Sequence, residues 1–375
     1  MTDRIARKIN TLLDAFESNT EGIDLIVQAL GEPVREVREA AYWLLTEIQE
    51  ESAKAALRNY LPYTRMQGLH RITGHSEREP SYFVISTDNK ALLSNCHSQE
   101  SKGYAYATVK IWNLQTGQLT HTLPFTHEHI GMGHNGQTIV GHFQHIIEVR
   151  KSWETRYPLQ LFGSIDISSL TVSSDGSIVA GGGYLRDARS ELPGQIEVWD
   201  LKTDRVIHRL EWKPIRYTSF CLSLMIIPNT SLLLSQDNER LDHHRLWSLQ
   251  TGELICVFET SPSWFADAIA HTLNGGFIAS GIRDNAVNVW DLNTDRIIYS
   301  FPAYSPTAMT PDGKVLAYCN DRNEIVLWDL DVNERICTLP ENPSPIQAIC
   351  LSSDREWVVS YDDAQTIKIY GLPDE

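Results

Sequence analysis

The sequence lacks the segments that would place the chain in a membrane or outside the cell. No apolar run approaches the roughly 18 residues that a membrane-spanning helix needs, so no membrane span is expected. The N-terminus alternates charged and apolar residues and has no unbroken apolar segment like that of a signal peptide. The 6 cysteines form no Cys-x-x-Cys pair, and most lie in apolar, strand-like segments, which is typical of free thiols in a reducing compartment. We therefore expect a cytoplasmic protein.

Basic residues are also scarce. The chain has 32 Lys and Arg against 48 Asp and Glu, for a formal net charge of -16 and a pI of about 5.2. Binding to a phosphate backbone depends on Lys and Arg displacing counterions, so nucleic acid is not an expected partner. An acidic surface instead favours protein partners with basic segments, because opposite charges speed the encounter.

Sequence motifs of catalysis are missing as well. There is no Gly-x-Ser-x-Gly, Walker-type or dinucleotide-binding motif. Gly181–Gly183 follow a strand pattern, but they lead into a loop and not into a helix whose N-terminal amides could hold a phosphate. We read these glycines as close strand packing. The sequence therefore predicts a non-enzymatic protein with no catalytic residue, no cofactor and no metal.

One pattern is present seven times: a short strand that ends in a Trp-like position, followed by Asp-Leu or a remnant of it. The Trp-like positions recur at intervals of 38 to 49 residues, and a second marker, a tight turn such as Asp175-Gly176, lies between them. This period and signature are typical of one four-stranded propeller blade per repeat. The sequence therefore predicts an all-β, seven-bladed β-propeller with a small N-terminal α-helical unit. The Trp-like positions are Trp112, Arg150, Trp199, Trp247, Trp290, Trp328 and Tyr370.

The first and last repeats complement each other. The first begins with a strand-like segment at residues 68–73, whereas the last stops after its third strand at Tyr370. Residues 68–73 are the most economical source of the missing outer strand, because this clasp removes two open sheet edges. We expect a propeller over residues 67–375, closed by strand 68–73 in the last blade.

Residues 1–66 read as helices. Apolar residues at helical spacing predict helices over 3–17 and 22–30, a third that opens at Pro33, and a fourth over about 50–59. A single helical hairpin cannot bury its apolar face alone, so it should dock on something. Two interpretations stay open: a cap packed on the propeller, or a face for docking or dimerisation.

Taken together, the chain resembles a bacterial WD-repeat protein of the kind frequent in cyanobacteria, with a short HEAT-like helical segment before the propeller. The resemblance implies a rigid, non-catalytic interaction platform. It also implies a polar network in each blade of a Gly-His turn, a Ser or Thr, a turn Asp and the Trp, from which this chain departs: Arg150 replaces the Trp, and few blades keep the His or Asp. The blade residues implied are His75, Trp112, Trp199, Trp247, Asp284, Trp290, Trp328 and Tyr370. We expect Trp199, Trp290 and Trp328 to be buried and Arg150 to be partly exposed or paired.

The longest insertions point to a binding rim. Residues 97–107 and 184–194 both lie between the second and third strands of their blades, and insertions confined to one rim often mark the binding face. Aromatic and Arg side chains are favoured interface anchors. Alternatively, Trp264 packs between blades and the insertions are neutral. The candidate rim residues are Tyr104, Tyr106, Tyr184, Arg186, Arg216, Trp264 and Phe265.

Two rival functions remain. One is a metal- or small-molecule-binding propeller that uses the histidines of the second repeat, although zinc needs converging ligands and strand alternation would scatter these side chains over both faces. The other is a structural subunit that self-assembles through the helices, so the oligomeric state stays open. The histidines concerned are His121, His127, His129, His134, His142 and His145.

Overall fold

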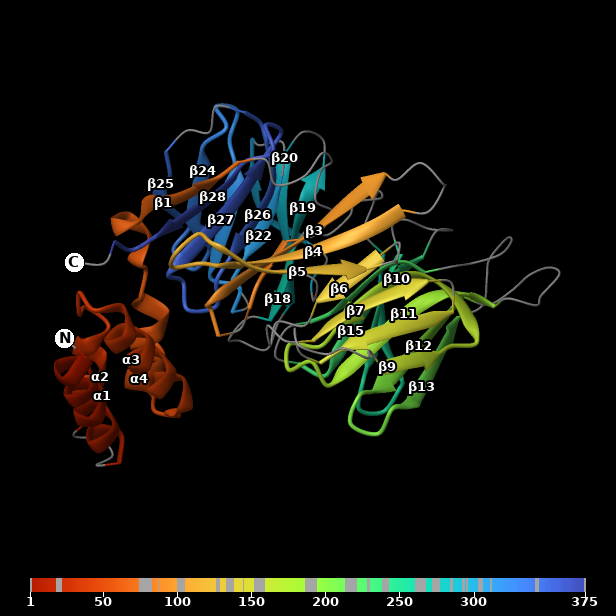
Figure 1. Ribbon diagram of the computed structural model, residues 1–375, viewed down its shortest axis with the longest axis horizontal. Coiled ribbons are helices and arrows are strands. Elements are labelled where there is room, and N and C mark those ends of the chain that lie inside the picture. The colour runs from red at the N-terminus through yellow and green to blue at the C-terminus, as the bar shows by residue number, and fades with distance from the viewer. Residues whose placement is uncertain are drawn as a thin grey trace.

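The computed structural model describes an N-terminal helical unit followed by a much larger region of antiparallel β-sheet (Figure 1). About half of the chain is strand, in agreement with the predicted all-β class. The described residues are 2–17, 22–73, 83–86, 88–99, 105–125, 129–132, 138–143, 145–151, 159–185, 194–212, 221–227, 230–237, 243–259, 268–271, 277–283, 286–291, 294, 296–302, 306–310, 312–340 and 344–373.

The predicted N-terminal helices are confirmed. They are α1 (Thr2–Glu17), α2 (Ile23–Ala29), α3 (Arg35–Glu47) and α4 (Glu51–Asn59), followed by the 3-10 turn η2 (Pro62–Arg65). Their apolar faces meet in a core of their own, and each of its buried members comes from residues 12–60. Because this core contains no residue of a strand, the helical unit packs as a separate body.

Seven four-stranded antiparallel sheets are formed by the described strands, and we number them along the chain. The first sheet holds β2 (Phe83–Ile85), β3 (Ala91–Gln99), β4 (Ala105–Asn113) and β5 (Leu119–Phe125); the second β6 (His129–Met132), β7 (Ile139–Phe143), β8 (Ile146–Arg150) and β9 (Leu159–Phe162); the third β10 (Ile165–Val172), β11 (Ile178–Leu185), β12 (Gly194–Asp200) and β13 (Arg205–Trp212). The fourth holds β14 (Cys221–Ile226), β15 (Leu232–Asp237), β16 (His243–Ser248) and β17 (Leu254–Glu259); the fifth β18 (Ala268–His271), β19 (Phe277–Arg283), β20 (Ala286–Asp291) and β21 (Arg296–Phe301); the sixth β22 (Thr307–Met309), β23 (Val315–Cys319), β24 (Ile325–Asp329) and β25 (Glu334–Thr338).

The last sheet takes its outer strand from the other end of the β region. It consists of β26 (Ile346–Leu351), β27 (Trp357–Asp362), β28 (Ile367–Gly371) and β1 (Gln67–Ile72). β1 is antiparallel to β28, with Gly68 opposite Tyr370 and Arg71 opposite Lys368. In Figure 1 the orange β1 accordingly lies beside the blue β28.

Tight turns join the first two strands of several sheets where the sequence predicts them. Gly176 between β10 and β11 has φ of 68°, and Gly313 between β22 and β23 has φ of 71°. At the first of these turns the Ser173 hydroxyl donates to Asp175 at 2.6 Å, and Asp175 accepts the backbone N–H of Ser177 at 3.0 Å. The side chains thus satisfy backbone groups that the change of direction leaves unpaired.

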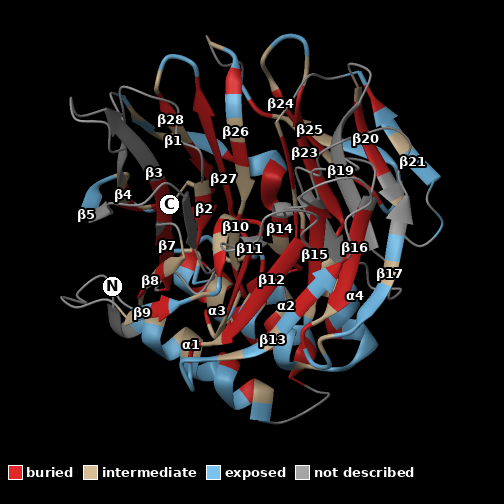
Figure 2. Cartoon of the chain, turned by 90° about the vertical axis from the view of Figure 1, so that its right-hand side faces the viewer, coloured by how far each residue is buried: buried red, intermediate tan, exposed pale blue. Residues whose placement is uncertain are grey.

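The last and first sheets pack on each other. Trp357 and Ile367 of the last sheet share one buried cluster with Leu92 and Trp112 of the first. At the edge of this contact His70 Nε2 of β1 lies 2.7 Å from the carbonyl oxygen of Gln115, which follows β4. Figure 2 shows the buried residues inside the sheets and exposed stretches on outer strands such as β17 and β21.

The tryptophans of the repeated pattern differ in their surroundings. Trp199 is 1% exposed, as expected. Trp112 and Trp247 are also buried, and their indole N–H groups donate to Ser94 at 3.0 Å and Ser235 at 2.9 Å. These Trp–Ser pairs are part of the polar network that the WD-repeat resemblance implies.

The expectation that Trp328 is buried is wrong. It is only partly buried, because its indole N–H reaches outward to the Asn333 side chain, 3.1 Å away in the exposed turn after β24. Arg150 is partly exposed and pairs with Glu148 at 3.0 Å, as expected. Tyr370 is buried. For Trp290 only the backbone is described, in β20 opposite Ala279, and His75 and Asp284 lie outside the described residues.

Candidate functional site

The predicted binding rim stays a prediction. Tyr106 and Tyr184 are described by their backbones alone: Tyr106 lies in β4 opposite Ser98, and Tyr184 lies in β11 opposite Gly194. Both stand next to the connection between the second and third strands of their sheets. The remaining rim residues, Tyr104, Arg186, Arg216, Trp264 and Phe265, lie outside the described residues.

The best-defined polar site lies elsewhere, where the helical unit meets the β region. Figure 1 shows the helices beside the blue strands of the last sheet. Their partners are the turns at residues 88–90, 330–333 and 352–357, which we call the docking face. β3 begins at Ala91 beside this face, and its nine residues span about 30 Å. The docking face and the predicted rim are therefore at opposite ends of the strands.

Glu356 is the centre of the contact. Although it is charged at neutral pH in water, it is only 2% exposed here. Arg38 of α3 donates from Nε to its Oε1 at 2.8 Å and from Nη2 to its Oε2 at 3.3 Å. The hydroxyl of Tyr60, at the end of α4, donates to Oε1 at 2.7 Å. A buried carboxylate needs such charge-assisted donors to offset its lost hydration, so the helices complete this site.

Arg35 adds a second cation from the same helix. Three residues apart, Arg35 and Arg38 lie on one face of α3. Arg35 stacks over the Trp357 ring with its guanidinium carbon 4.2 Å from the ring centroid, and its Nε is 3.7 Å from Glu356 Oε2. Its Nη2 pairs with Glu39 at 2.7 Å. Burial raises the pKa of Glu39 although the Arg35 charge opposes this.

Arg355 reaches in the opposite direction, from the sheets to the helices. Its Nη1 donates to the carbonyl oxygens of Leu57 at 2.7 Å and Tyr60 at 2.9 Å, which satisfies the end of α4. Its Nη2 pairs with Asp312 of the sixth sheet. Burial alone would raise the pKa of Asp312, but the Arg355 charge and the Thr310 hydroxyl hold it below its ordinary value. Each unit thus supplies an arginine to the other.

Asp354 is buried in the same turn with one oxygen unsatisfied. Its Oδ1 accepts the Ser352 hydroxyl at 2.5 Å and the backbone N–H of Glu356 at 3.0 Å, whereas Oδ2 is buried with no hydrogen-bond partner among the described residues. Burial, and then the nearby charge of Glu356, raise the pKa of Asp354 to about 7. This carboxyl group can therefore change its charge near neutral pH.

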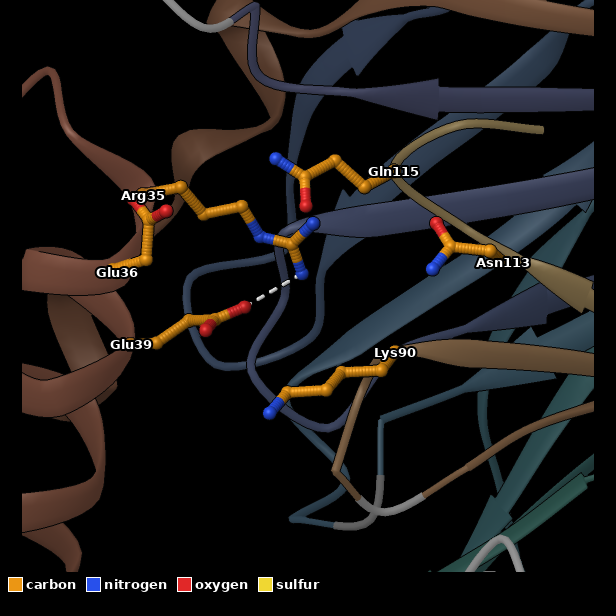
Figure 3. A pocket seen from close by; sticks show the side chains of 6 residues that line it. All are labelled: Arg35, Glu36, Glu39, Lys90, Asn113 and Gln115. Carbon is orange, nitrogen blue, oxygen red and sulfur yellow. Dashed lines mark ion pairs between the residues drawn. The ribbon is translucent and has the colours of Figure 1, made fainter. Parts of the chain in front are cut away.

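A polar cavity of about 310 Å³ separates α3 from the turns of the first sheet. Figure 3 shows the Arg35–Glu39 ion pair at its wall and Lys90 on the opposite side. The helical unit therefore touches the first sheet at Asn89, where Arg35 Nη2 donates to the carbonyl oxygen at 3.3 Å, and leaves open space beside this contact. The lining residues are Arg35, Glu36, Glu39, Lys90, Asn113 and Gln115.

The histidines of the second repeat do not gather into a site within the described residues. His121 lies in β5 of the first sheet, whereas the backbone of His129 in β6 is paired with that of His142 in β7 of the second. His127 and His134 lie outside the described residues. In the described part of the chain no three His, Cys, Asp or Glu side chains are placed to hold a metal ion.

The sequence left a cap packed on the propeller open as one interpretation of the helices, but it pointed to none of the residues that make this contact. One signal was present: Arg355 occupies a turn position where Asp-Gly is usual, and its φ of 64° is rare for a residue with a side chain. A further finding concerns the helices: none in the described residues has the length and apolar character needed to cross a membrane.

Comparison with known proteins supports the WD-repeat class at low identity. No protein-family model matches the chain. It is 31% identical over 141 residues to Ribosome biogenesis protein YTM1 of Scheffersomyces stipitis, covering 36% of this chain and 27% of the relative. It is 26% identical over 145 residues to Target of rapamycin complex subunit wat1 of Schizosaccharomyces pombe, covering 36% of this chain and 44% of the relative. Against the human Kinesin-like protein KIF21A, the identity is 22% over 87% of this chain and 20% of the relative.

The chain therefore spans less than half the length of each of these relatives. YTM1 and wat1 are WD-repeat proteins, and the strand-rich sheets of this chain fit the propeller that this class forms. Both are eukaryotic, so the bacterial origin of this chain remains a prediction. The HEAT-like character of the helices also remains a prediction, because these relatives do not support it.

Proposed function

We propose that the chain is a non-catalytic protein-interaction scaffold built on a closed, seven-bladed WD-repeat propeller. The observation that carries the proposal is the join between the two ends of the β region. β1 is the outer strand of the last sheet, and the last sheet packs on the first through Trp357 and Trp112. This arrangement completes the last sheet and packs it on the first, so that only the short outer edges of the blades remain, which favours a rigid disc.

Contacts between outer strands and neighbouring sheets add support. His208 of β13 lies 2.9 Å from the carbonyl oxygen of Leu249 in the fourth sheet, and the Tyr299 hydroxyl of β21 donates to Leu330 in the sixth at 2.8 Å. His70 makes the corresponding contact from the last sheet to the first. The same kind of contact, from an outer strand to the next sheet, thus recurs along the chain and at the proposed closure.

Partners are proposed to be proteins with basic segments, bound on the rim at residues 97–107 and 184–194. The net charge of -16 supports this choice through electrostatic steering. The relative wat1 is a subunit of the target of rapamycin complex, which supports a role of this chain in protein assemblies. The described cysteines, Cys256, Cys319, Cys337 and Cys350, are free, which supports the cytoplasm as the proposed compartment.

Affinity capture from the native host tests this function. The bait is the full chain, compared with a Tyr184→Ala/Arg186→Ala variant in the third sheet. A matched control, Lys202→Ala/Arg205→Ala, changes exposed residues at the other end of the same sheet. We expect specific partners that are lost from the rim variant, retained by the control and weakened by salt. Capture of no protein, or stoichiometric metal in the purified chain that is lost on His127→Ala/His129→Ala substitution, would contradict the scaffold function.

A further inference from the structure

We propose that the docking face is itself a binding site for a partner helix that carries arginines three residues apart, and that the helical unit occupies this site within the same chain. This inference rests on the proposed scaffold function and assigns it a second surface, with its own class of partner. The charges on the two sides of the contact are the first observation that supports it.

Glu356 receives all its side-chain partners from the helical unit. Within the described residues, the side chains that donate to or pair with its carboxylate are Arg35, Arg38 and Tyr60. At a second point Arg58 of α4 pairs with Asp331 at 2.7 Å. At these two points the β region presents acids and the helices bring the cations, whereas Arg355 of the β region donates to carbonyl oxygens at the end of α4. Without the helices, Glu356 would offer a carboxylate in a shaped, partly apolar setting that suits a guanidinium.

The contact has the character of an interface between separable bodies. The helices have their own apolar core, and the hydrogen bonds and ion pairs described above join it to the sheets. Polar contacts of this kind are typical of transient interfaces between domains. The cavity beside α3 leaves the contact incomplete on the side of the first sheet.

The chain between the two bodies is anchored independently of the helices. Tyr63 and Met66 are buried in the apolar cluster shared by the sixth and last sheets, next to the start of β1. Release of α1–α4 therefore requires no change in the pairing of β1 with β28. The helical unit can leave the docking face while the proposed closure remains intact.

The geometry specifies the recognised pattern. Arg35 stacks on Trp357, Arg38 reaches Glu356, and one helical turn further on the Tyr42 hydroxyl donates to the Ser353 carbonyl at 2.8 Å. Arginine suits both positions, since its planar group can stack on an aromatic ring and donate two hydrogen bonds to one carboxylate. A partner helix with Arg-x-x-Arg-x-x-x-Tyr would reproduce these contacts.

The helical unit competes with such a partner from within the chain. A short tether gives it an effective concentration on the order of millimolar, so a free helix binds the intact chain only weakly. The test therefore weakens the internal contact. The probe is a fluorescein-labelled peptide with the sequence of residues 33–49, and its matched control has glutamine in place of both arginines.

Fluorescence anisotropy is measured on the full chain, on its Arg35→Gln/Arg38→Gln variant, and on that variant with Glu356→Gln added. We expect the arginine peptide to bind the double variant at least about tenfold more tightly than the unchanged chain, because its internal competitor is weakened. We also expect the control peptide and the added Glu356→Gln change each to lose most of this binding. Equal affinity of both peptides, or of the unchanged chain and the double variant, would overturn the proposal.

A further peptide keeps the test independent of whether the Glu356→Gln variant folds. Lysine at both arginine positions preserves the charge and removes the planar donors, so we expect binding weakened by several-fold. Equal binding of the lysine and arginine peptides would show attraction by charge alone and overturn the specific site. Partner capture at the opposite rim is measured separately. Failure of the peptide to bind, with that capture intact, would refute this inference and leave the scaffold function standing.

Discussion

Arg38 and Glu356 are 318 residues apart in the chain, and a 2.8 Å hydrogen bond from Nε to Oε1 joins them in the fold. Both side chains are almost fully buried. The pair therefore exists only when the helical unit and the last sheet are in contact. It ties the two ends of the chain together on the docking face, at the other end of the strands from the proposed binding rim.

Substitution of Arg38 should weaken this contact strongly. Arg38→Ala leaves Glu356 buried without its principal cation, and breaking a buried pair in this way typically costs about 3–5 kcal/mol. Urea unfolding of Arg38→Ala, Glu356→Ala and the double variant forms a double-mutant cycle. We expect the unfolding free energy lost by the double variant to be well below the sum of the losses of the two single variants. Additive losses would show that the pair is not coupled.

The pH dependence of stability should contain a contribution from Asp354. Its pKa is raised to about 7 in the fold from 3.8, so the folded chain holds this proton to higher pH than the unfolded chain does. Stability from this group is therefore present below about pH 4 and is lost as the pH rises to about 7. We expect Asp354→Asn to flatten this decline and to be the more stable form at pH 8. Parallel curves of unfolding free energy against pH for the two proteins would contradict this assignment.

The Trp-like positions should differ in their energetic weight according to burial. We expect Trp199→Ala to cost about 3–5 kcal/mol, as is usual for a large buried side chain. Trp328→Ala should cost less, because Trp328 is only partly buried. Arg150→Ala should cost the least of the three, since its pair with Glu148 is partly exposed to solvent. The decrease in melting temperature of each variant measures this order. Equal decreases for Trp199→Ala and Arg150→Ala would contradict it.

Local patterns in the sequence predicted the elements well, but not the residues that join the helical unit to the last sheet. The four helices follow from apolar spacing and from the helix start expected at Pro33, and the repeated Trp positions locate third strands of the sheets. The outward turn of Trp328 depends on Asn333, five residues later, and no repeat pattern encodes it. The Arg38–Glu356 pair has no local signature at all, because it depends on how two distant surfaces meet.

The closure of the β region by β1 is the central claim, and two N-terminal deletions test it most directly. Removing residues 1–66 leaves β1 in place, whereas removing residues 1–75 takes it away and exposes the edge of β28. Solubility and cooperative thermal melting are measured for both products. We predict a soluble, cooperatively melting chain after the shorter deletion and aggregation after the longer one. A soluble product lacking residues 1–75 that melts as cooperatively as the shorter deletion would contradict the closure.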